Sequence, residues 1–195
     1  MRRIFIGTLV VLTIALINGC ANRKITRVDP NETIDLSGRW NDSDSRLVSE
    51  EMIGDLLTSA WIPRYLKAND KRPVVVVGLV ENKSHEHINS ETFIKDVEKA
   101  IIRDGNIRLV VAGEKRNELR KERAEQQDYA SPETTKKWGK ELGADFILQG
   151  TINSIVDSYK KQKVVTYQID LQLTNIETNE VVWMGDKKIK KQISD

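Results

Sequence analysis

The chain lacks the cysteines, aromatic residues and long apolar runs on which several protein classes depend. It has one cysteine in 195 residues, so no disulfide framework holds it together. Aromatic residues make up 6% of the chain and charged residues 31%. No apolar run approaches the roughly 20 residues that a membrane-spanning helix needs. These shortages exclude disulfide-stapled and multi-spanning membrane proteins and leave one ordinary soluble domain.

The chain also has little net charge. Lys and Arg number 31 against 29 Asp and Glu, a balance of +2, and Arg2 and Arg3 lie in a segment that we expect to be removed. The remaining chain is then 29 against 29, or neutral. Because binding to nucleic acid depends on a positive field, this balance argues against a nucleic-acid partner.

The N-terminus has the anatomy of an export signal. A short basic start is followed by an uncharged apolar run over residues 4–17. At about 1.5 Å per residue this run spans about 21 Å, which is less than the roughly 30 Å of a hydrocarbon core. We therefore expect a cleaved signal peptide over residues 1–19 rather than a permanent membrane span.

The residues that follow resemble a bacterial lipobox. Ile17, Asn18 and Gly19 precede Cys20, which is the single cysteine. The resemblance implies cleavage before Cys20, diacylglycerol on its sulfur and an acyl group on its new amine. At about 0.8 kcal/mol per buried CH₂, several such chains hold a protein to a bilayer. Because Ala21 is not the aspartate that retains such proteins in the inner membrane, the resemblance also implies the periplasmic face of the outer membrane.

Composition divides the rest of the chain into a tether and a domain. Residues 20–42 are polar, contain a single proline and show no apolar periodicity, so we expect a lipidated, short tether. Up to Asp42, the segment that follows Cys20 reaches at most about 75 Å when fully extended. The periodic apolar patterns lie within residues 43–195, which are expected to form the globular domain.

Apolar periodicity predicts a parallel unit in the first part of the domain. Apolar spacings of three and four residues predict helices over 47–61 and 90–104. Pro63 is expected to stop or kink the first of them. A β-branched run predicts a central strand over 74–80, and a second strand is expected over 107–112. With the helix between them, these strands predict a parallel β-α-β unit.

Two further helices are expected after this unit. Residues 114–127 include nine charged residues and predict a charged, exposed helix held by i,i+4 pairs. Ser131 and Pro132 are typical of a helix start and predict a further helix over 132–142.

The period changes to two in the last third of the chain. This alternation predicts antiparallel strands over 146–153, 165–174 and 181–184. Residues 187–191, four of them lysine, are expected to end the chain on a charged sheet edge that discourages pairing with other chains. The predicted fold class is mixed α/β, with one mixed sheet and flanking helices.

Few residues have the spacing of a catalytic or metal site. His85 and His87 need a third ligand that the sequence does not supply, so we interpret them as solvated loop histidines. Neither a Ser-His-Asp nor a Cys-His arrangement is well supplied. Asp42 and Asp44 suit the first turn of a helix better than a calcium loop or a pair of catalytic carboxylates. We expect no catalytic residue, cofactor or metal.

Two features leave alternatives open. Trp40 lies in a polar stretch before the first helix, where it is either a hydrophobic lid on the domain or an exposed anchor for a partner. Lys160, Lys161 and Lys163 lie between two strands, either as a solvated hairpin tip or as a basic contact with a partner.

Four stretches together resemble the LpoB family, lipoproteins that activate penicillin-binding proteins. They are DLSGRWNDSDSRLVSEEMI (35–53), PVVVVGLVENKSHEHI (73–88), LGADFILQGTINSI (142–155) and NIETNEVVWMGDKKIKK (175–191). The resemblance covers about Asp35 to Lys191, which is nearly all of the chain after the expected signal peptide. It implies a fold similar to the N-terminal domain of TolB.

The resemblance also implies a function without catalysis. Lipoproteins of this family reach from the outer membrane through the peptidoglycan, bind a bifunctional penicillin-binding protein and stimulate its glycosyltransferase and transpeptidase activities. We expect the chain to be a monomer that contacts this synthase through Trp40, Asp42, Asp44 and Arg46, because an aromatic residue and an arginine beside a helix start suit an interface. The short tether departs from the long Pro-rich tether of the best-known members and leaves the particular synthase open.

Two other functions remain open from the sequence. A structural or secretion-assembly lipoprotein would use a similar TolB-like or curli-secretion-like domain and would form oligomeric rings. A periplasmic hydrolase would turn over peptidoglycan without an added synthase.

Overall fold

A computed structural model of the chain describes residues 25–134 and 141–194. The chain divides into two compact units, Met1–Glu32 and Thr33–Asp195. The second unit contains residues 33–42, which the sequence placed with the tether. The expected signal peptide and Cys20 lie outside the described residues. Of the helices in the described ranges, none has both the length and the apolar character that crossing a bilayer requires.

The domain begins with two helices where the sequence predicted one. Asn41 caps α2 (Asp42–Thr58), and α3 (Trp61–Asn69) follows after a two-residue break. The expectation that Pro63 ends or kinks the first helix is wrong, because Pro63 is the third residue of α3. Proline is tolerated in a first turn, where a backbone N–H has no partner within the helix. The first helix ends instead just before Ser59, whose hydroxyl donates to a carbonyl of the last turn of α2 at 2.9 Å.

The next elements form the predicted parallel unit. β1 (Val74–Asn82) and β2 (Arg108–Val110) are parallel neighbours, and α4 (Ser90–Asp104) lies between them in the sequence. The side chain of Asn89 caps the start of α4, and Gly105 ends the helix in the left-handed conformation at φ 78°. The prediction of a β-α-β unit is confirmed.

The charged helix is also found where the sequence predicts it. α5 (Gly113–Tyr129) contains no buried residue. Arg120 and Arg123 both bind the carboxylate of Glu141, each at 2.9 Å. Most of the helix predicted over 132–142 lies outside the described residues, and its first described residues form a turn.

Three antiparallel strands complete the sheet. They are β3 (Phe146–Tyr159), β4 (Gln162–Asn175) and β5 (Val181–Ser194), each longer than the alternation predicted. The order across the sheet is β2-β1-β3-β4-β5. β1 is parallel to β2 and β3, and the remaining pairs are antiparallel. The predicted fold class is confirmed, and the lysine-rich strand β5 is an outer strand, as expected for a charged edge.

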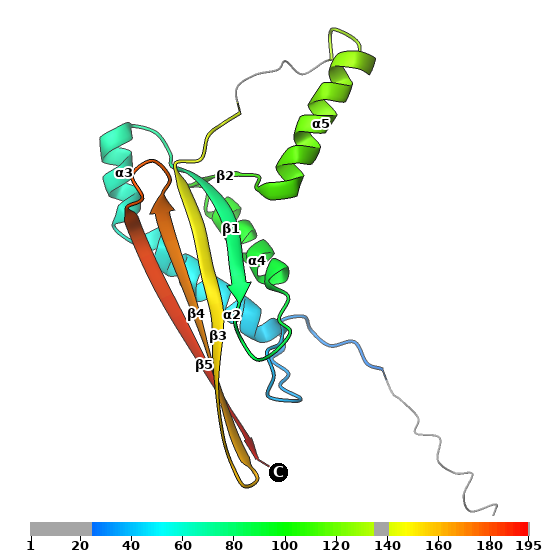
Figure 1. The fold of residues 1–195 in the computed structure, drawn as a ribbon, viewed down its shortest axis with the longest axis vertical. Helices are drawn as coiled ribbons and strands as arrows, with labels where there is room; N and C mark the ends of the chain where they lie inside the picture. The colour runs from blue at the N-terminus through cyan, green and yellow to red at the C-terminus, as the bar shows by residue number, and fades with distance from the viewer. Residues whose placement is uncertain (1–24, 135–140, 195) are drawn as a thin grey trace, which may run out of the picture. The chain divides into compact units, whose positions relative to one another are not determined.

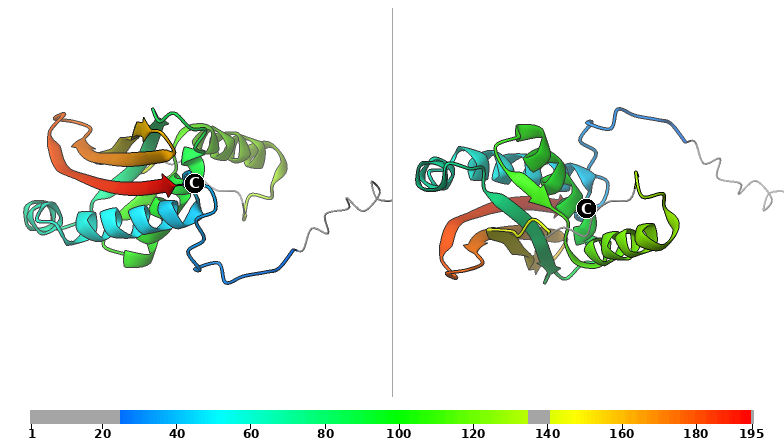
Figure 2. Two further views of the ribbon diagram at one scale, coloured as in Figure 1. Left: turned by 90° about the horizontal axis from the view of Figure 1, so that it is seen from below. Right: turned by 90° about the horizontal axis from the view of Figure 1, so that it is seen from above.

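The core lies between one face of the sheet and the helices α2 and α4 (Figures 1 and 2). Its centre consists of residues from α2, α4, β3 and β4 that are at most 1% exposed, among them Leu56, Phe93, Leu148, Ile169 and Leu173. The β3–β4 hairpin continues beyond these helices (Figure 1), and residues 155–162 are exposed.

β3 leaves no room for a side chain at Gly150, where it lies against β4. A Cβ at this position would lie 2.2 Å from the backbone oxygen of Asp170. We expect Gly150→Ala to lower the free energy of unfolding by about 2–3 kcal/mol, because the backbone of β4 cannot yield as a flexible side chain does. Urea denaturation of the purified protein measures this change.

Gly54→Ala is the matched control. Gly54 lies on the exposed side of α2 with nothing within 4 Å of its Cβ position. The same substitution should raise the free energy of unfolding there by about 0.5–1 kcal/mol, through helix propensity. Equal effects at the two glycines would contradict the close approach.

Candidate functional site

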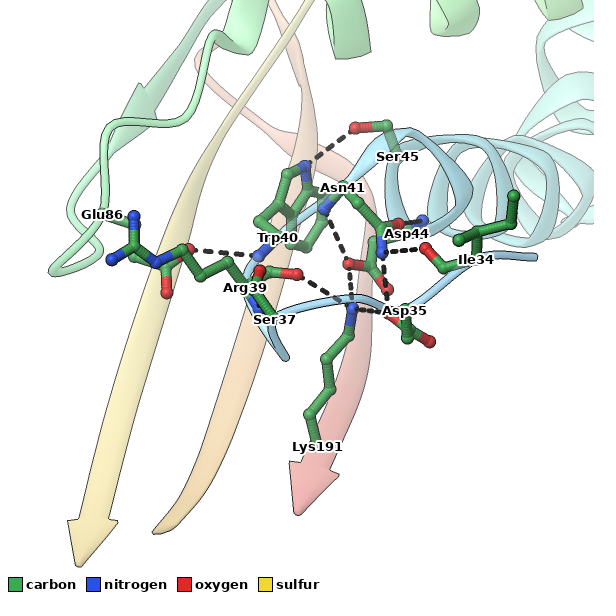
Figure 3. A network of polar contacts seen from close by, with 10 residues as sticks. All are labelled: Ile34, Asp35, Ser37, Arg39, Trp40, Asn41, Asp44, Ser45, Glu86 and Lys191. Carbon is green, nitrogen blue, oxygen red and sulfur yellow. Dashed lines mark hydrogen bonds and ion pairs between the residues drawn. The ribbon is translucent and has the colours of Figure 1, made fainter. Parts of the chain in front are cut away.

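One lysine of the last strand fixes the segment that precedes α2 (Figure 3). Lys191 Nζ lies 2.6 Å from Asp44 Oδ2 and 2.6 Å from Asp35 Oδ1, and it donates to the backbone oxygen of Arg39 at 3.0 Å. Its three N–H groups therefore have three acceptors. The side chains of Lys191 and Asp44 are 10% and 6% exposed, so this ion pair is buried.

The contacts of Lys191 shift the pKa values of Lys191 and of Asp35. Burial lowers the pKa of Lys191, but the hydrogen bonds and charges of Asp35 and Asp44 outweigh it and leave the pKa above its ordinary value. The hydrogen bond from Lys191 lowers the pKa of Asp35. Asp35 is about half exposed, so solvent screens its share and the pair with Asp44 dominates.

Asp44 has a second function at the start of α2. Asn41 Oδ1 accepts a hydrogen bond from Asp44 N at 3.1 Å, and Asp44 Oδ2 accepts one from Asn41 N at 2.9 Å. These reciprocal bonds form a capping box. The interpretation of this acidic residue as part of a helix start is confirmed. One carboxylate therefore both begins the helix and holds the last strand.

Two further contacts extend this connection along α2 and β5. Trp183 Nε1 donates to Asp55 Oδ2 at 2.9 Å, and Lys187 forms an ion pair with Glu51. Together with Lys191, these β5 residues are spaced four apart, so they point to the same face of the strand. Each binds an acidic side chain of α2. Of the three pairs, Asp44 and Lys191 are the one nearest the N-terminus of the helix and the C-terminus of the strand.

Trp40 is held by contacts on several sides (Figure 3). Its backbone N–H donates to Glu86 Oε2 at 3.1 Å, and its indole N–H donates to Ser45 Oγ at 2.8 Å. Its ring packs edge-on against the ring of Tyr167, with 5.5 Å between the centroids. Trp40 is half-buried and packs against the core. This geometry matches the hydrophobic lid, one of the two alternatives for this residue.

The four residues predicted to contact a partner lie close together but in different environments. Asp42 is exposed on the first turn of α2. Arg46 is half-buried and its Nη1 lies 3.5 Å from a carboxylate oxygen of Glu50. Asp44 is 4% exposed. Asp42 and Arg46 therefore present side chains to the outside, whereas Trp40 and Asp44 hold the segment in place.

The loop after β1 brings together a serine and a histidine that are distant in sequence. His85 Nδ1 lies 2.6 Å from Ser154 Oγ, and His85 Nε2 lies 3.3 Å from Glu86 Oε1. Hydrolases use the same three groups. Here, however, Ser154 Oγ also accepts the backbone N–H of His85 at 3.0 Å, which fixes the loop to β3. We interpret these contacts as attachment of the loop. Within the described ranges, no three His, Cys, Asp or Glu side chains converge as metal ligands.

A cavity of about 530 Å³ opens on the other face of the sheet. Val76 and Ile147 line it, and Val76 alternates with residues that face the core. Its lining includes two charged residues, Arg116 and Glu141. The hydrogen bond and charge of Arg120 lower the pKa of Glu141 to about 2, so this carboxylate remains ionised and engaged with arginine. A second cavity, of about 360 Å³, is lined mostly by polar residues around Asp145. Neither cavity is lined by the residues of the Lys191 network.

Sequence reasoning did not identify Lys191 or Asp35. Lys191 and Asp44 are 147 residues apart, and no local motif relates them. One weak signal was present, because Lys191 has the same parity in the alternation of β5 as the buried Trp183. A lysine at such an inward position requires a buried negative partner.

We expect Lys191→Met to destabilise the domain strongly. Methionine keeps most of the length of the side chain but leaves the Asp44 carboxylate buried without its cation. The free energy of unfolding should fall by about 3 kcal/mol, measured by urea denaturation at pH 7. Lys190→Met is the control, because Lys190 is exposed on the opposite face of β5, and its effect should stay within about 0.5 kcal/mol. Equal effects of the two substitutions would show that the Lys191–Asp44 ion pair does not stabilise the domain.

The pH dependence of the same difference identifies its cause. The raised pKa of Lys191 means that its contribution is present below the unfolded value of about 10.4 and is lost as pH rises through the folded value. The lowered pKa of Asp35 means that its contribution is present above about pH 3.9 and is lost as pH falls through the folded value. The difference between the protein and Lys191→Met should therefore be largest between about pH 4 and pH 10.

A family model matches most of this domain. The model, described as the peptidoglycan-synthase activator LpoB, covers residues 44–189. The matched range begins at the Asp44 capping residue and ends two residues before Lys191. None of the curated proteins matches the chain.

Several solved structures are similar to the chain at low identity. The LpoB C-terminal domain from Escherichia coli is 18% identical, with 75% of this chain and 98% of that chain covered and a TM-score of 0.48. The NMR structure of E. coli LpoB is 16% identical, with 88% and 82% covered and a TM-score of 0.41. Lipoprotein GNA1162 from Neisseria meningitidis is 15% identical, with 62% and 83% covered and a TM-score of 0.38.

Proposed function

This chain belongs to the LpoB family of peptidoglycan-synthase activators, and we propose that it is an outer-membrane lipoprotein that binds and activates a bifunctional penicillin-binding protein. The family match over residues 44–189 carries this proposal. It spans the domain from α2 to β5, so it includes the core and both helices that cover it. The protein would regulate peptidoglycan synthesis without catalysing a reaction itself.

The proposed anchor lies outside the described residues. The basic start, the apolar run over 4–17 and the single cysteine support a signal peptide over residues 1–19 and lipidation of Cys20. Diacylglycerol and an additional acyl chain would attach the protein firmly to a bilayer. Ala21 in place of aspartate supports export to the outer membrane, with the domain on the periplasmic side.

The tether available to this anchor is short. Residues 33–42 belong to the compact unit, in which Asp35 is bound by Lys191. Residues 20–32 therefore connect the lipid to the domain, and thirteen residues span at most about 45 Å when fully extended. A synthase anchored in the inner membrane would have to extend towards this domain to meet it.

Activation would be allosteric. A protein that binds the active state of an enzyme more tightly than its inactive state shifts the enzyme towards activity. Such a mechanism needs a binding surface and no reacting group on this chain. Among the residues that the sequence assigned to the contact, Asp42 and Arg46 are proposed to touch the synthase, and Trp40 and Asp44 to fix them in position.

A reconstituted synthase assay tests the activation. The purified protein, added at equimolar concentration, should raise the glycan polymerisation rate of a bifunctional penicillin-binding protein from the same organism several-fold, because it stabilises the active state. A glycosyltransferase that is not a penicillin-binding protein is the control, and its polymerisation rate should be unaffected. The proposal would be refuted if the protein captured no penicillin-binding protein from membranes and left the polymerisation rate unchanged.

Substitutions at the proposed processing site test the anchor. Cys20→Ser should yield a protein without attached acyl chains by mass spectrometry, and membrane fractionation should no longer find it in the outer membrane. The matched variant Ala21→Asp should keep the acyl chains and move the protein to the inner-membrane fraction. Acyl chains on the Cys20→Ser protein would show that the anchor lies elsewhere.

A further inference from the structure

The far half of β3 has a free edge. The ladder between β1 and β3 ends where Asn82 lies opposite Ile152, but β3 continues to Tyr159 and pairs there only with β4. Within the described part of the chain, residues 153–159 therefore have a strand on one side and no strand on the other, and the loop after β1 contacts the near end of this edge through His85 and Ser154. Figure 1 shows this part of the β3–β4 hairpin extending beyond the helices.

The backbone groups on this edge form a regular row. Lys83 N donates to the backbone oxygen of Ile152 at 2.8 Å, so the carbonyl of Ile152 points away from β4. Successive residues of a strand direct their backbone groups to opposite sides. The N–H and C=O groups of Ser154, Val156 and Ser158 therefore point to the same free side as Ile152. A row of this kind pairs readily with another extended chain.

The two outer edges of this part of the sheet differ in how they are protected. β5 carries two exposed lysines, Lys188 and Lys190, which discourage pairing. The free edge of β3 has only one charged residue, Asp157, between Ile155 and Tyr159. Ile155 is 71% exposed, Tyr159 72% and Val156 40%. Exposed β-branched and aromatic residues on an unprotected edge are typical of a binding strand.

We propose that an extended, acidic segment of the synthase adds to β3 as a further strand, paired with residues 154–158. This inference rests on the proposed function and names the contact surface. Three lysines at the hairpin tip (160, 161 and 163) and one aspartate leave a local charge of +2, which complements acidic side chains in the added segment. A second copy of this chain would bring the same positive charge, so the charge favours a different protein.

A proline at the centre of the edge tests the proposal. The N–H of Val156 points to the free side, so Val156→Pro removes a donor that the β3–β4 ladder does not use. Binding of the full chain to the purified bifunctional penicillin-binding protein should weaken at least ten-fold. The control Val156→Thr keeps the N–H and the β-branched shape, and its dissociation constant should stay within about two-fold.

Two further measurements support the test if the proline disturbs the fold. Ile155→Lys combined with Tyr159→Lys places charges on exposed positions, as β5 does, and should also weaken binding at least ten-fold. Lys160→Glu combined with Lys161→Glu should weaken binding and reduce its dependence on salt. Amide exchange of residues 153–159 in the unmodified protein should slow when the synthase is added.

The outcomes separate this inference from the proposed function. If the unmodified protein binds the synthase and the folded Val156→Pro and double-lysine variants bind equally well, the edge is not the contact and the activator function stands. If the unmodified protein does not bind the synthase, both proposals fail. A dimer of the purified protein that Val156→Pro dissociates would assign the edge to a second copy and overturn the inference.

Discussion

The domain depends on a buried pair of opposite charges, Lys191 and Asp44. A carboxylate that begins a helix is usually exposed, but this one is covered and therefore requires a cation. Once Lys191 supplies it, the start of α2 is fixed against the end of β5. The contacts of Trp183 and Lys187 with α2 then align this helix along β5. The residues before α2 follow, because Asp35 and the backbone of Arg39 bind the same ammonium group.

Local patterns in the sequence predicted the fold class and most of the described secondary structure. The valine run of β1, the periodicity of α4 and the alternation of β3 and β4 each act within a few residues. Pro63 misled the prediction because proline tolerates a first helical turn as well as a helix end. The alternation also predicted too short a strand for β5, since two of its later inward positions, Lys187 and Lys191, carry lysine in place of an apolar residue.

The candidate site could not be predicted in the same way. Lys191 with Asp44, His85 with Ser154 and Trp40 with Tyr167 are pairs separated by 147, 69 and 127 residues. A sequence pattern shows that each residue is polar or aromatic, but not which distant residue it meets. The free edge of β3 could not be predicted for a similar reason. How far β3 extends beyond β1 depends on the register between these two strands, which no local pattern gives.

The position of Lys191 and its two carboxylate partners also determines how the domain would respond to mechanical load. The polypeptide enters the folded unit beside Asp35, which is bound to Lys191, and Lys191 lies opposite Val165 of β4. Val165 in turn lies opposite Val156 of β3. Tension from the proposed membrane attachment would therefore act on the start of α2 and on β5, and the complete strand β4 separates β5 from the edge of β3. The domain can in this way be pulled at one side of its sheet while the geometry at the other side is preserved.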